Sequence, residues 1–212
     1  MLPAQKISNR ERRRERTKTL IVQAAEELLA EGGLQNMTLA NIANRAAYSK
    51  PSIYDYFTGI EDILNELVNS GFIRLGNLVK SISDTLLPEE KLVATINCIL
   101  QFAEENVELY QLMFTHIIFK NNGQDLDSHG ANTDTQAAYL AAAEIIQSGI
   151  EQGVFKTRPG FDHSAMLYLC WVTVHGMASL KPLLLTEVGM NARQQQSVLI
   201  DHILRSLKGE FV

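Results

Sequence analysis

Apolar residues recur along most of the chain at helical spacing, and no stretch shows the alternation of apolar and polar residues that marks a half-buried strand. The first helix is predicted from Arg16 or Thr17 to Glu31, and two glycines end it. Further helices are predicted over residues 58–83, 88–106, 108–119, 133–152, 162–181 and 191–208. The predicted fold class is therefore all-α.

Residues 38–57 hold two short helices that are joined by a turn of three residues. Thr38 is a typical N-cap residue for the first helix, and Ser49 begins the second, which has a proline in its first turn. Ile53 and Phe57 lie one turn apart and form the inward side of the second helix. This arrangement is typical of a helix-turn-helix, whose second helix enters the major groove of DNA.

The charge of the chain is divided unevenly. The formal net charge is −5. Residues 1–60 carry nine Lys/Arg and six Asp/Glu, a net charge of +3, whereas residues 61–212 carry ten Lys/Arg and eighteen Asp/Glu, a net charge of −8. Within residues 6–18, seven Lys/Arg stand against two Glu. A basic head on an acidic body predicts that only the N-terminal end approaches phosphate groups.

The composition favours a soluble globular protein and argues against several other classes. Of the 212 residues, 46% are hydrophobic, and no apolar run reaches the ~18 residues that a membrane span needs. Cys98 and Cys170 lie in apolar helical stretches, which is typical of small buried side chains in the reducing cytoplasm. Neither a nucleophile with its base nor a metal-ligand spacing occurs, so we expect no enzyme, no cofactor and no metal site.

Residues 16–64 resemble the DNA-binding head of the tetracycline-repressor (TetR) family of bacterial regulators. The family pattern combines an Ala-Ala pair, a Thr, an Ile-Ala pair, a Ser-led turn and an aromatic ending. Its counterparts here are Ala24-Ala25, Thr38, Ile42-Ala43, Ser49 and Tyr54-Asp55-Tyr56-Phe57. Two departures matter. The usual Gly-Val turn is Ala47-Tyr48, and Ile60 stands where a phosphate-binding lysine is common. A left-handed Ala47 would carry about 1 kcal/mol of strain.

The candidate DNA-binding residues lie at the start of the first short helix and along the second: Thr38, Ser49, Lys50, Pro51, Ser52, Tyr54, Asp55 and Tyr56. In the second helix, on the side away from the inward apolar residues, a lysine can donate to guanine and an aspartate can accept from cytosine. The tyrosine hydroxyls can donate to phosphates, a role that the resemblance also implies. The threonine can donate its hydroxyl, or the amide at its helix start, to a phosphate. The alternatives are a solvated face, a tyrosine that packs on the first long helix, and a threonine that only caps its helix.

Residues 1–15 are predicted to be a flexible basic arm. Four arginines, Arg12, Arg13, Arg14 and Arg16, lie in or beside it. They would follow the DNA backbone or enter the minor groove, and the alternative is a disordered, solvated tail. Contacts of this kind position a protein on DNA without specifying the sequence.

The second domain offers candidates for an effector pocket. In the TetR family a mostly apolar cavity between the middle helices binds the effector, so the resemblance implies a pocket of this kind. The candidates are Phe72, Phe102, Tyr110, Met113, Phe114, His116, Phe119, Tyr139, Trp171 and His175. Core packing is the alternative for each of them. The two histidines are either polar anchors for a ligand or buried side chains with a hydrogen-bond partner of their own.

Together these features predict a cytoplasmic transcriptional regulator, most simply a repressor that a small-molecule effector releases from a palindromic operator. Residues 1–60 would form the DNA-binding domain and residues 61–212 the effector-binding and dimerisation domain. The helix over residues 162–181 has almost no polar face, so we expect one side in the core and another against a partner. The last two helices would form a four-helix bundle in a homodimer. The alternatives are a regulator without a ligand, one that needs a corepressor, or an all-α interaction scaffold.

Overall fold

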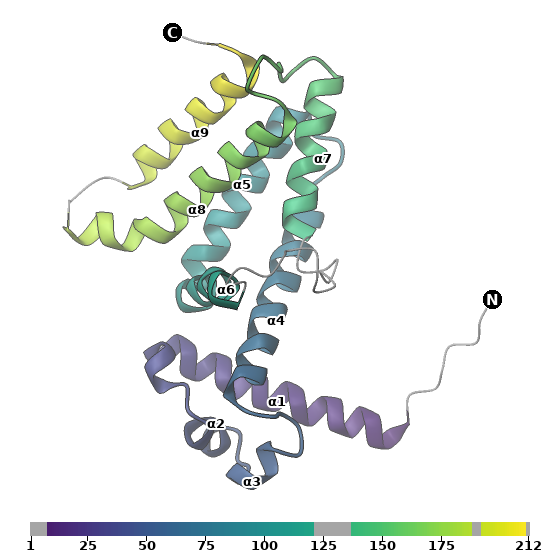
Figure 1. Cartoon of the computed structure of the whole chain (residues 1–212), viewed down its shortest axis with the longest axis vertical. Coiled ribbons are helices and arrows are strands. Elements are labelled where there is room, and N and C mark those ends of the chain that lie inside the picture. The colour runs from purple at the N-terminus through teal and green to yellow at the C-terminus, as the bar shows by residue number, and fades with distance from the viewer. Residues whose placement is uncertain (1–7, 121–136, 188–191, 211–212) are drawn as a thin grey trace. The chain divides into compact units, whose positions relative to one another are not determined.

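The computed structural model describes residues 8–120, 137–187 and 192–210, and Figure 1 shows the order of the elements. In these ranges the chain is helical, with a single isolated bridge between Arg158 and Phe161. The elements are α1 (Asn9–Gly32), η1 (Leu34–Asn36), α2 (Leu39–Arg45), α3 (Lys50–Ile53), α4 (Ile60–Lys80), α5 (Pro88–Glu105), α6 (Val107–Lys120), α7 (Ala137–Glu151), α8 (His163–Glu187) and α9 (Ala192–Lys208). The prediction of an all-α fold is confirmed.

Contacts between Cα atoms divide the chain into two compact units. The first unit comprises residues 1–71 and 106–120, and therefore holds α1 to α3, the first part of α4, and α6. The second comprises residues 72–105 and 121–212, with the end of α4 and the helices α5, α7, α8 and α9. α4 is one continuous helix that begins in the first unit and ends in the second. The functional boundary after residue 60 stays a prediction.

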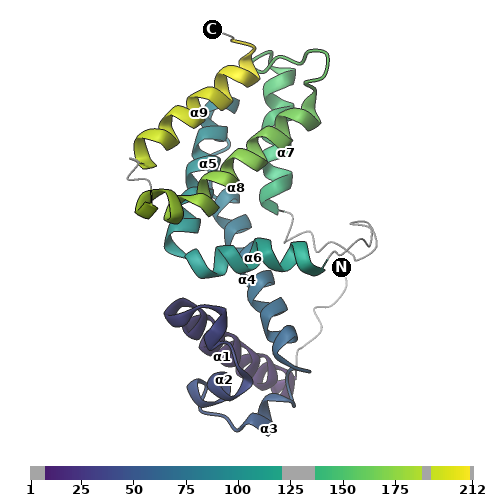
Figure 2. The ribbon, with the colours of Figure 1, turned by 60° about the vertical axis from the view of Figure 1, so that its left-hand side comes forward.

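In the first unit, α1 packs against α2 and α6, and α2 packs against α3 (Figure 2). The side chains of Ile21, Ile42 and Ile53 are fully buried and join α1, α2 and α3. α6 also lies close to α4, because a Cβ atom on Gly71 would be only 2.6 Å from the sulfur of Met113. A side chain at Gly71 would therefore push the buried Met113 away from α4.

In the second unit, α5 packs against α7 and α8, and α8 packs against α7 and α9. The chain leaves α7 through a tight turn in which the amide of Phe155 donates to the carbonyl of Gly149 over 3.0 Å. A Cβ atom on Gly149 would lie 2.1 Å from the Phe155 ring, which is buried. Glycine at this position therefore lets the ring close over the end of α7.

The first helix begins earlier than predicted. It starts at Asn9, so the prediction of a flexible arm over residues 1–15 is wrong for residues 9–15. The cause is a capping box: the Glu11 amide donates to Ser8 Oγ over 3.2 Å, and the Ser8 amide donates to Glu11 Oε2 over 2.8 Å. The Arg and Glu residues that follow are good helix formers and sustain the helix without an apolar face.

Two other helix ends differ from the predictions. α8 continues through Pro182 to Glu187, whereas the sequence predicted an end at residue 181. A proline inside a helix removes one hydrogen bond, but the helix can continue past it. At the start of α4, the Thr58 amide donates to the carboxylate of Asp62 over 3.0 Å, and not to Glu61 as the sequence pattern predicted. The predicted caps at Thr133 and Asn191 lie outside the described residues. Across the described ranges, no helix is both long and apolar enough to cross a membrane.

Candidate nucleic-acid interface

The first helix of the helix-turn-helix is fixed at its start by Thr38. Its Oγ1 accepts a hydrogen bond from the Asn41 amide over 3.1 Å, so the predicted N-cap is confirmed. Behind it, Ile42 and Ala43 of α2 and Ile53 of α3 are buried, and α2 packs against α3, as the sequence pattern predicted. Because the side chain of Ala43 is small, α2 and α3 can pack closely against each other.

The turn between α2 and α3 contains a left-handed alanine. Ala47 has φ 58°, which is the conformation that the comparison with the usual glycine anticipated. Its neighbour Tyr48 secures the turn from both sides. The Tyr48 amide donates to Ala43 over 2.9 Å, and its hydroxyl donates to Thr17 Oγ1 of α1 over 3.4 Å. The turn is therefore held in a strained conformation by contacts on either side of it.

Replacing Ala47 by glycine should stabilise the protein by about 0.5–1 kcal/mol. Glycine relieves the steric strain of the left-handed conformation, and its larger entropy in the unfolded chain offsets part of that gain. Urea unfolding measures the change. Ala46→Gly is the matched control, because Ala46 has φ −76° and should lose about as much as Ala47 gains. Equal destabilisation by both changes would contradict strain at Ala47.

The second helix is capped by Ser49, whose Oγ accepts from the Ser52 amide over 3.2 Å. α3 spans only Lys50–Ile53, and bonds from each amide to the carbonyl three residues earlier tighten the chain through Tyr56. Ile53 and Phe57 are buried, as predicted. The recognition element is thus one helical turn followed by a tight turn, shorter than the sequence pattern indicated.

All eight candidate DNA-binding residues lie in the first unit, at the start of α2 or on and around α3. Six of them are exposed: Thr38, Ser49, Lys50, Pro51, Tyr54 and Asp55. Ser52 is half-buried and shares a 2.7 Å hydrogen bond with Ser49. Their contact with DNA stays a prediction, but the structure brings them together on one short segment.

The two tyrosines that follow α3 have different surroundings. Tyr54 is 54% exposed, whereas Tyr56 is half-buried and the guanidinium carbon of Arg14 lies 5.3 Å from its ring centroid. In the same way, Lys18 Nζ lies 5.7 Å from the ring of Phe57. The alternative of a tyrosine that packs on the first long helix therefore applies to Tyr56, and Tyr54 is the better candidate for a phosphate contact.

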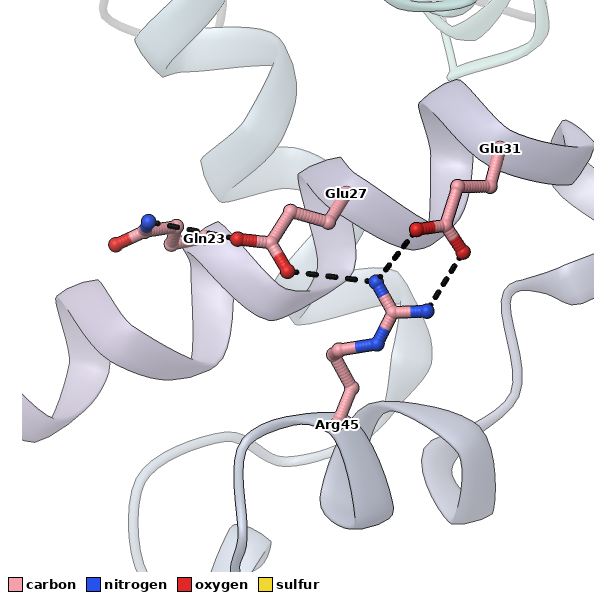
Figure 3. Close-up of polar contacts among 4 residues, drawn as sticks. All are labelled: Gln23, Glu27, Glu31 and Arg45. Carbon is pink, nitrogen blue, oxygen red and sulfur yellow. Dashed lines mark hydrogen bonds and ion pairs between the residues drawn. The ribbon is translucent and has the colours of Figure 1, made fainter.

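A salt bridge that the sequence did not reveal ties α2 to α1 (Figure 3). Arg45 Nη2 lies 2.6 Å from Glu31 Oε2, and Nη1 lies 3.3 Å from Glu27 Oε2. The hydrogen bond from Arg45 lowers the pKa of Glu31 below its ordinary value. Glu27 and Glu31 stand one turn apart on α1, which is the signal that could have suggested a shared partner. Arg45 therefore holds α2 in place and is occupied by this pairing.

The effector-pocket candidates are divided between the two units. Tyr110, Met113 and Phe114 lie in the first unit, where the rings of Tyr110 and Phe114 are 4.7 Å apart. In the second unit lie Phe72, Phe102, Tyr139, Trp171 and His175. The side chains of His116 and Phe119 fall outside the described part of the chain. Phe72, Phe102, Tyr110 and Met113 are buried, which fits core packing as well as a pocket lining, so their role stays a prediction.

One aromatic cluster of the second unit joins three of these candidates. The Trp171 ring centroid lies 5.4 Å from that of Tyr139 and 4.2 Å from that of His175, and both contacts are edge-to-face. Burial lowers the pKa of His175 to about 4, so the imidazole is neutral at pH 7. His175 is therefore an uncharged side chain that packs against Trp171 in a largely buried position.

A cavity of ≈ 390 Å³ lies elsewhere in the second unit, between the end of α4, the start of α5, and α7. Apolar side chains such as Val79, Leu86 and Ile145 line it, together with Lys91 and Glu144. None of the effector-pocket candidates lines this cavity. The candidates and the cavity are therefore separate features of the second unit.

Comparison with known proteins relates the chain to bacterial regulators. Residues 21–67 match the family model described as bacterial regulatory proteins, tetR family. The HTH-type transcriptional repressor KstR2 of Rhodococcus jostii (strain RHA1) is 25% identical over 160 residues, which cover 73% of this chain and 74% of that protein.

Solved structures share the fold. The transcriptional regulator FadR of Bacillus subtilis, in complex with stearoyl-CoA, aligns with a TM-score of 0.68 at 19% identity and covers 89% of this chain and 98% of that chain. A protein with unknown function from Rhodococcus sp. RHA1 aligns with a TM-score of 0.73 at 19% identity, over 98% of this chain and 100% of that chain. At these identities the alignments establish a common fold.

Proposed function

Since the chain is a DNA-binding transcriptional regulator of the TetR family, we propose that it is a repressor that binds a palindromic operator as a homodimer and releases it when a small molecule binds. The observation that supports a DNA-binding surface is that the segment formed by α3 and the turn after it has one buried side and one exposed side. Ile53 and Phe57 are buried in the head, while Lys50, Pro51 and Asp55 are exposed on the same short segment. This segment is free to enter a major groove.

We assign the exposed side chains of α3 and of the turn after it to base edges, and the hydroxyl groups around them to phosphates. Lys50 can donate to guanine O6 or N7, Asp55 can accept from cytosine N4, and Pro51 can pack on a thymine methyl group. Tyr54 and Thr38 can donate hydroxyl protons to phosphate oxygens, which fixes the head on the duplex without selecting a sequence. The two groups of residues therefore make different predictions for mutagenesis.

Binding to the DNA upstream of the protein's own gene is the first test. A gel-shift titration at low salt should give a specific complex whose affinity falls steeply as salt is added, because counterions leave the phosphates on binding. Failure to bind any segment of that DNA at low salt would contradict the proposed regulator. A complex insensitive to salt would contradict phosphate neutralisation by the head.

Lys50→Ala should relax the preference for one base pair, whereas Tyr54→Phe should weaken binding to all sequences alike. Removing a specific base contact costs about 1–3 kcal/mol, or roughly 5- to 150-fold in affinity for the preferred operator. Binding to a panel of singly substituted operators separates the two effects. Lys80→Ala, an exposed lysine on α4 in the second unit, is the control. If Lys50→Ala and Tyr54→Phe both act uniformly, the division into reading and positioning residues is wrong.

We assign dimerisation to α8 and α9, in line with the sequence prediction. α8 buries Leu167, Cys170 and Val174 in its own unit and exposes Tyr168 and Val172 on another side. Val198 and Leu199 are likewise exposed on α9, which packs beside α8. A two-fold dimer through these helices would present two recognition segments to half-sites about 34–36 Å apart, or a multiple of that distance.

We further propose that a mostly apolar small molecule acts on the second domain. The buried aromatic candidates and the Trp171 cluster support this class of ligand, and the related fold of FadR holds stearoyl-CoA. α4 joins the two units as one helix from Ile60 to Lys80, so a displacement of its end in the second unit would move its start in the head. The ligand changes operator affinity only if it binds the two positions of α4 with different affinity.

A further inference from the structure

We propose that the first two turns of α1 form a rigid basic strut which contacts the DNA backbone beside α3 through one of its faces. This inference rests on the proposed binding of operator DNA. Every residue from Asn9 to Arg16 is exposed, and Thr17 is the first buried residue of α1. At 1.5 Å per residue the exposed part of the helix is about 12 Å long. Figure 1 shows this end of α1 extending beyond α3 and the start of α4.

Arginines continue the buried face of α1 into the exposed part. Arg10, Arg13 and Arg14 precede the buried Thr17 by seven, four and three residues, and these spacings place them on one side of the helix. From Thr17 onward the same side packs into the head through Ile21. The face of α1 that covers the helix-turn-helix therefore becomes a basic face where the head ends.

Two contacts direct this face toward α3. The guanidinium of Arg14 lies over the Tyr56 ring, with 5.3 Å between its central carbon and the ring centroid. One turn later, Lys18 Nζ lies 5.7 Å from the Phe57 ring centroid. Tyr56 directly follows the exposed reading residues of α3. The strut consequently starts beside the surface that is assigned to the major groove, and a duplex held there passes close to it.

The strut has the charge and the order that phosphate binding requires. Residues 8–18 carry six Lys/Arg and two Glu, and the capping box between Ser8 and Glu11 closes the helix at its free end. Glu11 and Glu15 are not spaced to share the face of Arg10 and Arg13. Since the helix already orders these arginines, binding to phosphate costs less backbone entropy than binding by a flexible arm.

The first test compares two pairs of arginines with equal charge on different sides of the strut. The variant Arg10→Ala/Arg13→Ala changes the proposed contact face, and Arg12→Ala/Arg16→Ala is the matched control. Arg14 is left in place because it contacts Tyr56. Alanine preserves the helix. The full-length protein is titrated with a labelled operator duplex at several salt concentrations, and log K is plotted against log[salt].

The Arg10/Arg13 variant should give a less steep salt dependence, by about 0.9 for each phosphate that is no longer neutralised, or roughly 1.8 for each protomer. The preference among substituted operators should stay as in the wild type, because phosphate contacts do not read bases. The Arg12/Arg16 variant should change the slope by less than half as much. Equal changes in the two pairs, or no change in either, would overturn the proposed contact face.

The second test separates a rigid strut from a flexible tail. Glu15→Pro breaks α1 before Thr17, while Glu15→Gln removes the same negative charge and keeps the helix. Glu15→Gln should bind operator at least as tightly as the wild type, and Glu15→Pro should bind more weakly with a less steep salt slope. Identical binding by the two variants would show that helical order is not needed and would overturn the strut. A wild-type protein that does not bind operator at low salt contradicts the proposed function instead.

Discussion

Replacing Tyr168 and Val172 of α8 together by glutamate should lower the affinity for operator DNA at least a hundredfold, or by about 2.7 kcal/mol. Tyr168 is 70% exposed and Val172 is 49% exposed in the single chain. Two carboxylates on each protomer would meet their copies across the two-fold axis and would have to lose water there. The dimer should dissociate, and a single head then makes only half of the DNA contacts.

The structure supports this face of α8 as the interface because large apolar side chains follow it at intervals of one turn. Tyr168, Val172 and Leu180 are all exposed and share it with Gly176. Among the described residues, and apart from its own helix backbone and chain neighbours, an added Cβ atom on Gly176 would meet no atom within 4 Å. A glycine in an open position on such a face lets a second helix approach closely. Isologous two-fold contacts of this kind generate most homodimers.

Leu87→Glu is the control, since Leu87 is an apolar residue that is 62% exposed outside α8 and α9. It should leave both the dimer and the operator affinity unchanged. Sedimentation equilibrium gives the molar mass, and a gel shift gives the affinity. A double variant that remains a dimer would refute this α8 face as the interface. A monomeric variant with wild-type affinity would refute the need for a dimer.

Acidification should weaken the protein by up to about 3 kcal/mol through His175 alone. Burial lowers the pKa of His175 to about 4 in the folded protein, whereas an unfolded histidine has a pKa near 6.5. Between these values the unfolded chain binds a proton that the folded protein does not. Stability is therefore complete above about pH 6.5, falls as the pH decreases, and levels off below about pH 4.

His175→Gln tests this expectation because glutamine keeps a polar side chain of similar size and does not titrate. The free energy of unfolding in urea is measured for both proteins at pH 7 and at pH 5. The wild type should lose about 2 kcal/mol more than the variant over this interval. Parallel losses in the two proteins would show that another group controls the acid sensitivity, and that the imidazole beside Trp171 is accessible to protons.

The sequence predicted most of the helix-turn-helix because its determinants are local. Thr38 and Ser49 cap their helices through amides three residues away, and the burial of Ile42 and Ile53 follows from helical spacing. Even the left-handed Ala47 follows from the glycine that usually occupies its turn. The early start of α1 was missed because an exposed helix has no buried apolar side, so the spacing of apolar residues does not reveal it.

Other features of the site depend on residues that are distant in sequence. The pairing of Arg45 with Glu27 and Glu31 joins residues 14 and 18 positions apart, and no periodicity predicts it. The contact of Arg14 with Tyr56 likewise distinguishes the two tyrosines, which the sequence left equivalent. These differences change which residues are the better candidates for DNA contact and which hold the head together.

By itself, the sequence determined that the chain is helical, where a helix-turn-helix lies, and which end is basic, because helical hydrogen bonds, caps and charge are properties of short stretches. Only the tertiary structure decided that α6 packs with the head, where Gly71 of α4 accommodates Met113, and that the exposed apolar side of α8 is the one with Tyr168 and Val172. An apolar stripe specifies that a helix face will be buried, but several partners satisfy it equally. The choice among them depends on the shapes of side chains that meet from distant parts of the chain.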